Sequence, residues 1–270
     1  MRFRQEPHLR LGSVDEAAAW VDDVGLCLFQ GEKGGLPSFY GAVAGQGGPA
    51  PRWGSNDGHY GRAWDWKDKL FSRRRVYYGK LLGDYRMLVS RALLPYVIAA
   101  CAPGPTTDAD DYLALYQDGL LRADAKLVYE ALLSTGPAST KKLRDASHLN
   151  GKGGVFRRFE KALTELQNAC LVCPIGIDRD NRWKYTFRYA PLHVAFPDET
   201  QRSAELSSRE ATKHLLAHYV ELVGSAQAPA VQRLFGWAPE RMKRAVEQLV
   251  DDGAIDQAGG VLSWRDSRRM

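Results

Sequence analysis

Apolar residues recur at helical spacing along the chain, and short β-rich segments follow these helices. In the segment GVFRRFEKALTELQN (154–168), one helical face carries Phe156, Phe159, Leu163 and Leu166, and the basic residues lie outside that face. The stretches CLVCPIGI (170–177) and WKYTFRYA (183–190) follow it, joined by the turn-forming link DRDNR. Upstream, residues 111–121, 123–136 and 137–149 are each typical of a helix. The middle of the chain is therefore predicted to run through four helices into a β-hairpin.

The C-terminal part repeats this order in shorter form. Residues 209–224, 226–236 and 238–253 are predicted helices, and GAIDQAGGVLSW (253–264) contains two short strands around a Gly-Gly turn. The phrases ALTELQNACLV and AVEQLVDDGAI match in pattern. Helices followed by a β-wing are typical of a winged helix-turn-helix. We therefore predict a mainly α protein with small β-hairpin wings (α+β), built from tandem winged helix-turn-helix domains.

Three breaks in the pattern divide the chain. The Gly/Pro-rich residues 45–61 are expected to form a long loop without a regular element, and further breaks fall at 101–111 and 196–208. Before the loop, Ser13 and Glu16 form a capping-box pattern at the start of a helix. We predict an N-terminal winged-helix-like domain (1–105) with the Gly-rich loop and a basic aromatic segment, a winged helix domain (106–200) and a C-terminal winged helix domain (201–270).

Positive charge is concentrated in one region rather than spread evenly. The whole chain carries a net charge of +5, yet residues 62–91 contain nine Lys or Arg and three Asp. The predicted third helix and wing of the middle domain, and the third helix of the last domain, are also cationic through Arg157, Arg158, Lys161, Arg182, Lys184, Arg241, Lys243 and Arg244. Such helices commonly enter the major groove of DNA, and wings contact phosphates. The alternatives are solvated amphipathic faces or protein-interaction modules.

The stretch RAWDWKDKLFSRRRVYYGK (62–80) has the composition of a nucleic-acid surface. Aromatic rings can stack on bases and cations can hold phosphates. The candidates are Trp64, Trp66, Lys67, Arg73, Arg74, Arg75, Tyr78 and Lys80. The alternative is that both tryptophans anchor a core, that Asp68 is paired with Arg73 or Lys69, and that Tyr77 and Tyr78 alternate across a strand.

This segment also carries a family resemblance. Together with VGLCLF, GLPSFY and LVSRALLPY, the motifs WDWKD and YYGK resemble the AlkZ-related group of the winged-helix superfamily that includes the AlkZ and YcaQ DNA glycosylases. The similarity extends over residues 14 to about 255. It implies excision of alkylated or crosslinked bases by hydrolysis of the N-glycosidic bond, without a metal or cofactor. Those glycosylases carry a Gln, an apolar residue, then Gln or Asp; this chain has no such triplet, and Gln30 of LFQGE lies in the most comparable context.

Hydrolysis of an N-glycosidic bond requires a carboxylate or carboxamide near the anomeric carbon, and an aromatic site for the extruded base. The candidates here are Asp68, Asp65, Gln30 and Glu32. On a helix, Asp68 shares a face with Trp64 and with Asp65. The hypotheses are a DNA repair glycosylase, a non-catalytic DNA-binding protein such as a transcription regulator, and an interaction protein that binds no nucleic acid.

The remaining features limit the cell compartment and the partners. Neither an apolar run of about eighteen residues nor a secretory signal pattern is visible, so a cytoplasmic protein, nucleoid-associated if it binds DNA, is predicted. The single CxxC of Cys170 and Cys173 and the pair His214 and His218 are interpreted as buried thiols and unrelated histidines, not as a metal site. The absence of a heptad segment favours a monomer, and the predicted partner is double-stranded DNA.

Overall fold

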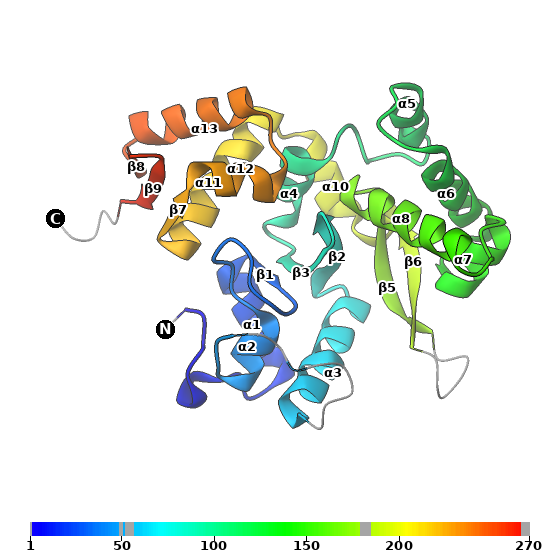
Figure 1. Cartoon of the computed structure of the whole chain (residues 1–270), viewed down its shortest axis with the longest axis horizontal. Helices are drawn as coiled ribbons and strands as arrows, with labels where there is room; N and C mark the ends of the chain where they lie inside the picture. Colours follow the sequence, from blue (N-terminus) through cyan, green and yellow to red (C-terminus); the bar gives the residue numbers. More distant parts are fainter. Residues whose placement is uncertain (1, 49–50, 52–56, 179–184, 266–270) are drawn as a thin grey trace.

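The same order of elements occurs three times along the chain: a helix, a short strand, two helices and two strands (Figure 1). The computed structural model describes residues 2–48, 51, 57–178 and 185–265. The first unit comprises α1 (Val14–Val24), β1 (Leu26–Leu28), α2 (Phe39–Ala44), α3 (Gly58–Ser72), β2 (Val76–Leu82) and β3 (Tyr85–Ser90). The second comprises α6 (Ala123–Thr135), β4 (Ala138–Ser139), α7 (Thr140–Ala146), α8 (Gly154–Asn168), β5 (Val172–Asp178) and β6 (Thr186–Pro191). The third comprises α11 (Ser208–Val223), β7 (Ser225–Gln227), α12 (Ala228–Phe235), α13 (Pro239–Asp251), β8 (Ile255–Ala258) and β9 (Val261–Trp264).

Each unit closes with a three-stranded antiparallel sheet of the same topology. The orders are β1-β3-β2, β4-β6-β5 and β7-β9-β8, so the last strand is always central. The predicted hairpins are confirmed, and each gains a third strand of two or three residues between the first two helices. The expectation of helices with small β-structures is thereby confirmed as a mixed α and β fold with small antiparallel sheets.

Short helices connect the units. The 3₁₀ helix η1 (Pro7–Leu9) precedes the first unit, α4 (Leu94–Cys101) and α5 (Asp111–Gln117) lead to the second, and α9 (Leu192–Ala195) and α10 (Pro197–Ala204) lead to the third. The helix α4 packs against α10 and α11, which brings the first and third units together. In the part of the chain that the structure describes, no helix is both long and apolar enough to span a bilayer.

Buried apolar side chains form two clusters. One extends from Leu11 to Ala100 and includes most of the buried residues between Leu192 and Leu262, so the first and third units share a core. The other belongs to the second unit, between Tyr112 and Tyr189. Phe187 of β6 packs against both clusters and links them. The domain boundaries near residues 105 and 200 stay predictions.

Local capping explains where the helices of the first unit begin. The Ser13 hydroxyl accepts a hydrogen bond from the Glu16 amide at 3.1 Å, which confirms one half of the predicted capping box. The Glu16 carboxylate accepts from the Gly12 amide at 2.9 Å and not from that of Ser13. The prediction of an irregular loop up to residue 61 is wrong at its end, because α3 already begins at Gly58. Asp57 accounts for the early start: Oδ1 accepts from the amides of His59 at 2.8 Å and Tyr60 at 3.2 Å.

The helix α8 has the apolar face expected from its sequence, with one exception. Phe159, Leu163 and Leu166 are buried in the second core, whereas Phe156 is 42% exposed. Phe156 lies in the first turn of α8, and the Arg144 guanidinium lies 5.1 Å from its ring centroid. In the first turn of α8, Val155 still packs against the second core, whereas the Phe156 side chain projects beyond it.

Candidate nucleic-acid interface

The Lys67 side chain of α3 is fully buried between the first and second units. Its Nζ donates a hydrogen bond to the Tyr185 hydroxyl at 2.6 Å and forms an ion pair with Asp68 Oδ1, also at 2.6 Å. The Tyr185 hydroxyl donates to the same Asp68 oxygen at 2.6 Å. These three groups thus form a closed triangle, and the carboxylate offsets part of the cost of burying the ammonium.

Aromatic rings surround the Lys67 ammonium on several sides. Nζ lies between 3.9 Å and 5.5 Å from the centroids of six rings: Phe29, Trp64, Phe71, Tyr78, Tyr185 and Phe187. We call these rings, together with Tyr60, the aromatic cluster. Ring faces attract a cation. Desolvation by burial nevertheless lowers the pKa of Lys67 to about 8, against the opposing effect of Asp68.

Two of the four catalytic candidates meet at the aromatic cluster. The side-chain oxygen of Gln30 accepts a hydrogen bond from the Tyr60 hydroxyl at 2.9 Å. The Tyr60 ring packs edge-on against Trp64, which packs edge-on against Tyr185, the partner of Asp68. Gln30, which follows β1, and Asp68 of α3 therefore lie at the two ends of one row of rings, which α3 and the segment before β6 contribute.

The other two catalytic candidates lie outside this cluster. Asp65 is exposed and forms an ion pair with Lys69 at 2.6 Å, one turn further along α3. Glu32 is exposed in the turn between β1 and α2. The expected alternatives for Asp68, a pairing with Arg73 or Lys69, are wrong, because Lys67 and Tyr185 occupy its Oδ1 atom.

The arginine run after α3 does not act as one surface. Arg73 is exposed, whereas Arg75 pairs with Asp22 of α1 at 3.5 Å. Arg74 has a positive φ of 56°, and its Nη1 donates to the carbonyls of Ser72 and Ile175, each at 2.8 Å. Arg74 therefore fastens the end of α3 to β5 of the second unit.

The remaining aromatic candidates are core residues. Trp66 is 9% exposed, and Tyr78 is 1% exposed, beside an equally buried Tyr77. The two tyrosines alternate across β2 as expected, but the alternation is not one of in and out, because both faces of the strand are covered: Tyr78 packs on Phe71, and Tyr77 packs on Phe196. Trp64 is half-buried in the aromatic cluster.

A groove runs between α8 and the β2–β3 hairpin of the first unit. It consists of two adjoining hollows of about 280 Å³ and 630 Å³ that share Lys80, Phe156, Glu160 and Thr164. We call it the α8 groove. Its lining contains more cations than carboxylates: Lys80, Arg86, Arg122, Arg144, Arg157 and Lys161 against Asp84, Glu160 and Glu165. Tyr78, Tyr185 and Phe187 of the aromatic cluster also line the smaller hollow.

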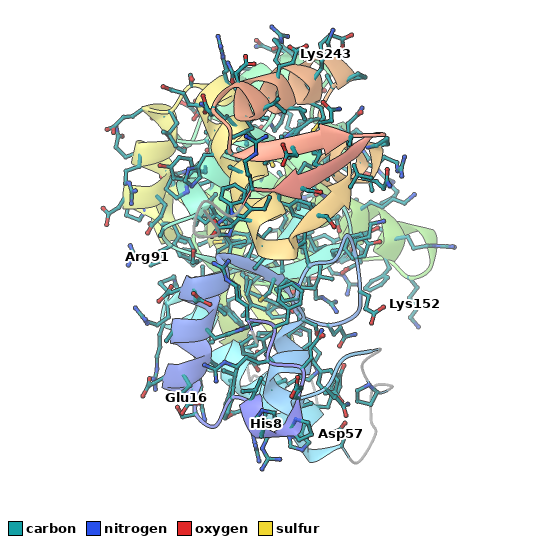
Figure 2. All side chains as sticks on the ribbon, turned by 90° about the vertical axis from the view of Figure 1, so that its left-hand side faces the viewer. His8, Glu16, Asp57, Arg91, Lys152 and Lys243 are labelled. Carbon is teal, nitrogen blue, oxygen red and sulfur yellow. The ribbon has the colours of Figure 1, made fainter. Side chains whose placement is uncertain are left out.

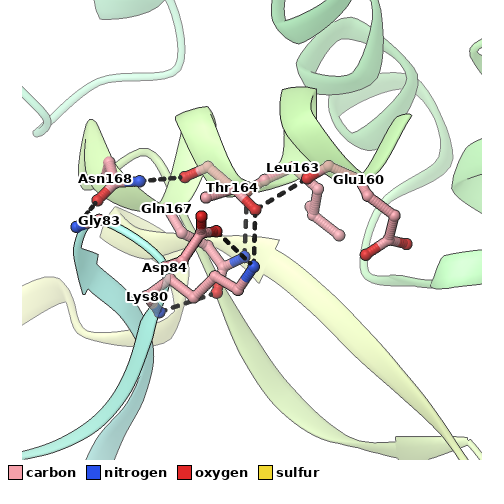
Figure 3. A network of polar contacts seen from close by, with 8 residues as sticks. All are labelled: Lys80, Gly83, Asp84, Glu160, Leu163, Thr164, Gln167 and Asn168. Carbon is pink, nitrogen blue, oxygen red and sulfur yellow. Dashed lines mark hydrogen bonds and ion pairs between the residues drawn. The ribbon is translucent and has the colours of Figure 1, made fainter. Parts of the chain in front are cut away.

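The C-terminal half of α8 is fixed to the hairpin by hydrogen bonds (Figure 3). Lys80 Nζ donates to Thr164 Oγ1 at 2.9 Å and pairs with Asp84 at 3.1 Å. The Lys80 amide donates to Gln167 Oε1 at 3.1 Å, and the Gly83 amide donates to Asn168 Oδ1 at 2.7 Å. This half of α8 is therefore part of the contact between the units.

The N-terminal half of α8 has a different environment. Arg157 and Lys161 are exposed there, beside the projecting Phe156. Within the described ranges neither cation forms an ion pair, whereas Arg158 pairs with Asp124 of α6 through two hydrogen bonds. The first two turns of α8 thus present unneutralised positive charge to solvent.

The corresponding helix of the third unit, α13, carries a mixed charge. Lys243 and Arg244 are exposed, and Lys243 lies 3.8 Å from Glu247. Figure 2 shows Lys243 at one end of the molecule, with Asp57 of the first unit and His8 of the preceding helix η1 at the other. Arg241 is half-buried and donates to Thr212 Oγ1 at 2.7 Å.

The wing of the second unit is only partly described. Arg182 and Lys184 lie outside the described residues.

The sequence interpretation did not include three residues that line the smaller hollow of the α8 groove: Tyr185, Arg86 and Arg144. Tyr185 lies in the β-rich segment from which only the cations Arg182 and Lys184 were predicted to bind DNA. Its contact with Lys67, 118 positions away, gives no signal in the local sequence pattern.

The cysteines and histidines have separate environments. Cys170 and Cys173 are fully buried, and burial raises the pKa of both thiols, that of Cys173 to about 12. His218 Nε2 lies 2.9 Å from the Val24 carbonyl, and the His214 ring stacks on Tyr96. In the described part of the chain no three His, Cys, Asp or Glu side chains gather as metal ligands.

Fold and site together define a protein of three repeated helical units, each with a small antiparallel sheet, and a cationic helix beside an aromatic cluster that surrounds a buried lysine. The sequence profile described as AlkZ related matches residues 11–236, and the chain belongs to the AlkZ-related family. The structure is similar to that of the Streptomyces sahachiroi DNA glycosylase AlkZ, with a TM-score of 0.57 and 12% sequence identity, over 99% of this chain and 67% of the other. At this identity the likeness concerns the fold. No curated protein matches the sequence.

Proposed function

We propose that the protein binds double-stranded DNA as a monomer through tandem winged helix-turn-helix units. Each unit has the helix order of this motif followed by a two-stranded wing, and membership in the AlkZ-related family supports the assignment. A location in the cytoplasm, on the nucleoid, belongs to the same proposal.

The environment of α8 carries this proposal. In a helix-turn-helix, residues in the N-terminal part of the third helix contact the base edges. Of the three third helices, α3 is covered by β5, and α13 carries mixed charge. In the described structure, the exposed N-terminal half of α8 carries two cations without an ion pair, Arg157 and Lys161, whereas that of α13 carries one, Arg244, because Lys243 pairs with Glu247. We therefore assign α8 to the major groove, with the α8 groove beside the backbone.

We further propose that the protein acts in DNA repair by hydrolysing the N-glycosidic bond of a damaged base, as the name of the similar AlkZ structure suggests. The reaction needs an ionised or strongly polar group that positions water at the anomeric carbon. Asp68 is our first candidate, because Lys67 and Tyr185 both contact its Oδ1 and hold the carboxyl group at the edge of the aromatic cluster. Oδ2 takes no hydrogen bond from the residues that the structure describes. Gln30, across the aromatic cluster, is the second candidate.

The alternative is a DNA-binding protein without catalysis. The occupied Oδ1 of Asp68 and the Gln30–Tyr60 hydrogen bond support this alternative, since both candidate groups already accept hydrogen bonds from tyrosine hydroxyls within the protein. DNA binding is common to both, and only a measurement of base release separates them.

The test uses duplexes that carry an alkylated purine or an interstrand crosslink, with abasic sites as the readout. A glycosylase would release the base, and Asp68→Asn or Gln30→Ala would abolish release while the duplex is still bound. Asp65→Asn, three positions away on α3, distinguishes the two aspartates and should retain release. Asp15→Asn on the exposed face of α1 is the matched control for the charge change. Binding without any release would favour the non-catalytic alternative, and absence of binding would refute both.

A further inference from the structure

A second cationic site lies in the third unit, away from the α8 groove. A cavity of about 240 Å³ lies between α11 and α13. Its lining consists of seven residues: Ser208, Arg209 and Thr212 from α11, and Arg241, Arg244, Ala245 and Gln248 from α13. Three of them are arginines, and none is acidic.

The guanidinium groups of this cavity are held by neutral acceptors. Arg241 Nε donates to Thr212 Oγ1 at 2.7 Å, and its Nη2 donates to the Ser208 carbonyl at 3.2 Å. Arg244 Nε donates to the Glu240 carbonyl at 3.2 Å. The Gln248 amide, with its oxygen turned toward Arg209, accepts from that guanidinium. Across the described residues, none of the three arginines forms an ion pair with a carboxylate.

Three cations in one small cavity repel one another, and their charge is not compensated by the protein. Arg241 is half-buried, and desolvation lowers its pKa, which shows that burial of this guanidinium disfavours its charged form. The cavity also adjoins the first turn of the sixteen-residue helix α11, where the helix dipole adds a positive partial charge. An anion would relieve both effects.

We propose that this cavity binds one phosphate group. Guanidinium groups match phosphate oxygens through paired N–H donors. Donors approach from α11 and from α13, which suits the several oxygens of a tetrahedral phosphate better than the two of a carboxylate. Arg209 and Arg244 are exposed and supply the adjustable contacts, and Arg241 is the fixed one, with its position set by the buried Thr212 hydroxyl.

Thermal unfolding of the full chain in inorganic phosphate tests the site. At a concentration about ten times the dissociation constant, phosphate should raise Tm by roughly 3 °C over chloride at equal ionic strength. The double variant Arg209→Gln/Arg244→Gln should lose this rise, and its Tm in chloride should be no lower than that of the wild type, because removing two cations also relieves their repulsion. Arg233→Gln, exposed on α12 outside the cavity, is the control and should keep the rise. A Tm that does not respond to phosphate, or a rise that the double variant retains, overturns the proposal.

The phosphate could belong to the DNA backbone or to a small molecule, and a second measurement separates these sources. In duplex binding at several salt concentrations, loss of a backbone contact lowers the slope of log K against log salt by about one for each contact. A lower slope in Arg209→Gln/Arg244→Gln assigns the site to DNA. An unchanged slope, with the phosphate-dependent Tm rise lost, assigns it to a phosphorylated small molecule. Since the Tm measurement contains no DNA, it stands even if the proposed DNA binding fails.

Discussion

Lys67 and Tyr185 are 118 positions apart in the chain, and a 2.6 Å hydrogen bond joins the Lys67 ammonium to the Tyr185 hydroxyl at the boundary of two units. The first residue lies on the third helix of the first unit, and the second lies just before the central strand of the next. A helix position that presents side chains to DNA in a free-standing helix-turn-helix is here an internal contact of the protein. The relative placement of the two units thus depends on a buried charge, and its strength can be measured.

Replacing Tyr185 with Phe should weaken this contact. The substitution removes a hydroxyl that accepts from Lys67 and donates to Asp68, and two charged groups lose a hydrogen-bond partner. We expect the free energy of unfolding to fall by about 1–3 kcal/mol in denaturant titration. Tyr85→Phe is the control, because Tyr85 has nearly the same exposure, 39% against 40%, and should change stability little. Equal effects of the two variants would contradict the structural role of the Tyr185 hydroxyl.

Lys67 should give the protein a specific dependence on pH. Its pKa is lowered from 10.5 to about 8 in the folded protein, so the unfolded chain binds more protons between these values. Burial of the ammonium therefore costs stability below about pH 8, and the cost decreases as the pH rises toward 10.5. Relative to Lys67→Met, the wild type should gain about 2 kcal/mol of unfolding free energy between about pH 7 and 9.5.

The comparison with Lys67→Met removes the titration of all other groups from this measurement. Lys69→Met, two positions further on the exposed face of α3, is the control. The difference in unfolding free energy between the wild type and Lys69→Met should stay constant over the same pH range. A constant difference between wild type and Lys67→Met at both pH values would mean that the ammonium is not held in a desolvated site.

Gly79→Ala should loosen the contact between β2 and α8. A Cβ at Gly79 would lie 2.5 Å from the Tyr77 hydroxyl and 3.1 Å from Gln167 Oε1, the acceptor for the Lys80 amide. Both neighbours are buried, so overpacking is expected to cost about 1–3 kcal/mol in thermal or denaturant unfolding. Gly61→Ala is the opposite case: a Cβ there meets open space within α3, and helix propensity should increase stability by about 1 kcal/mol. A neutral Gly79→Ala would show that the hairpin and α8 are not in tight contact.

Local pattern was sufficient for most elements and insufficient for their arrangement. The helix α8 and its hairpin follow from apolar spacing and from a turn-forming link, and Ser13 follows from its capping pattern. The strand Ala138–Ser139 is too short to produce any periodicity, and a two-residue strand is defined only by its partner β6. The role of Lys67 was likewise hidden, because two of the six rings around its ammonium, Tyr185 and Phe187, belong to a different unit. A run such as Arg73–Arg75 shows charge, but only the fold separates Arg74, bound to Ile175, from the exposed Arg73.

The assignment of α8 to the major groove predicts the salt dependence of DNA binding. Arg157 and Lys161 are exposed on its first two turns and unpaired in the described structure, so each can neutralise a phosphate. Arg157→Gln/Lys161→Gln should weaken binding to all duplexes and lower the slope of log K against log salt by about two. The variant Arg10→Gln/Arg202→Gln removes the same charge from exposed positions elsewhere and should leave the slope unchanged.

The pattern of loss also distinguishes the kinds of contact that α8 makes. If one of the two side chains contacts a base edge, its variant reduces discrimination between duplex sequences by about 1–3 kcal/mol, and the salt slope falls by about one instead of two. Equal losses in the α8 variant and in the Arg10→Gln/Arg202→Gln variant would show that binding follows net charge alone. In that case the exposed first turns of α8 are an amphipathic helix surface, and the DNA-binding element must lie elsewhere in the chain.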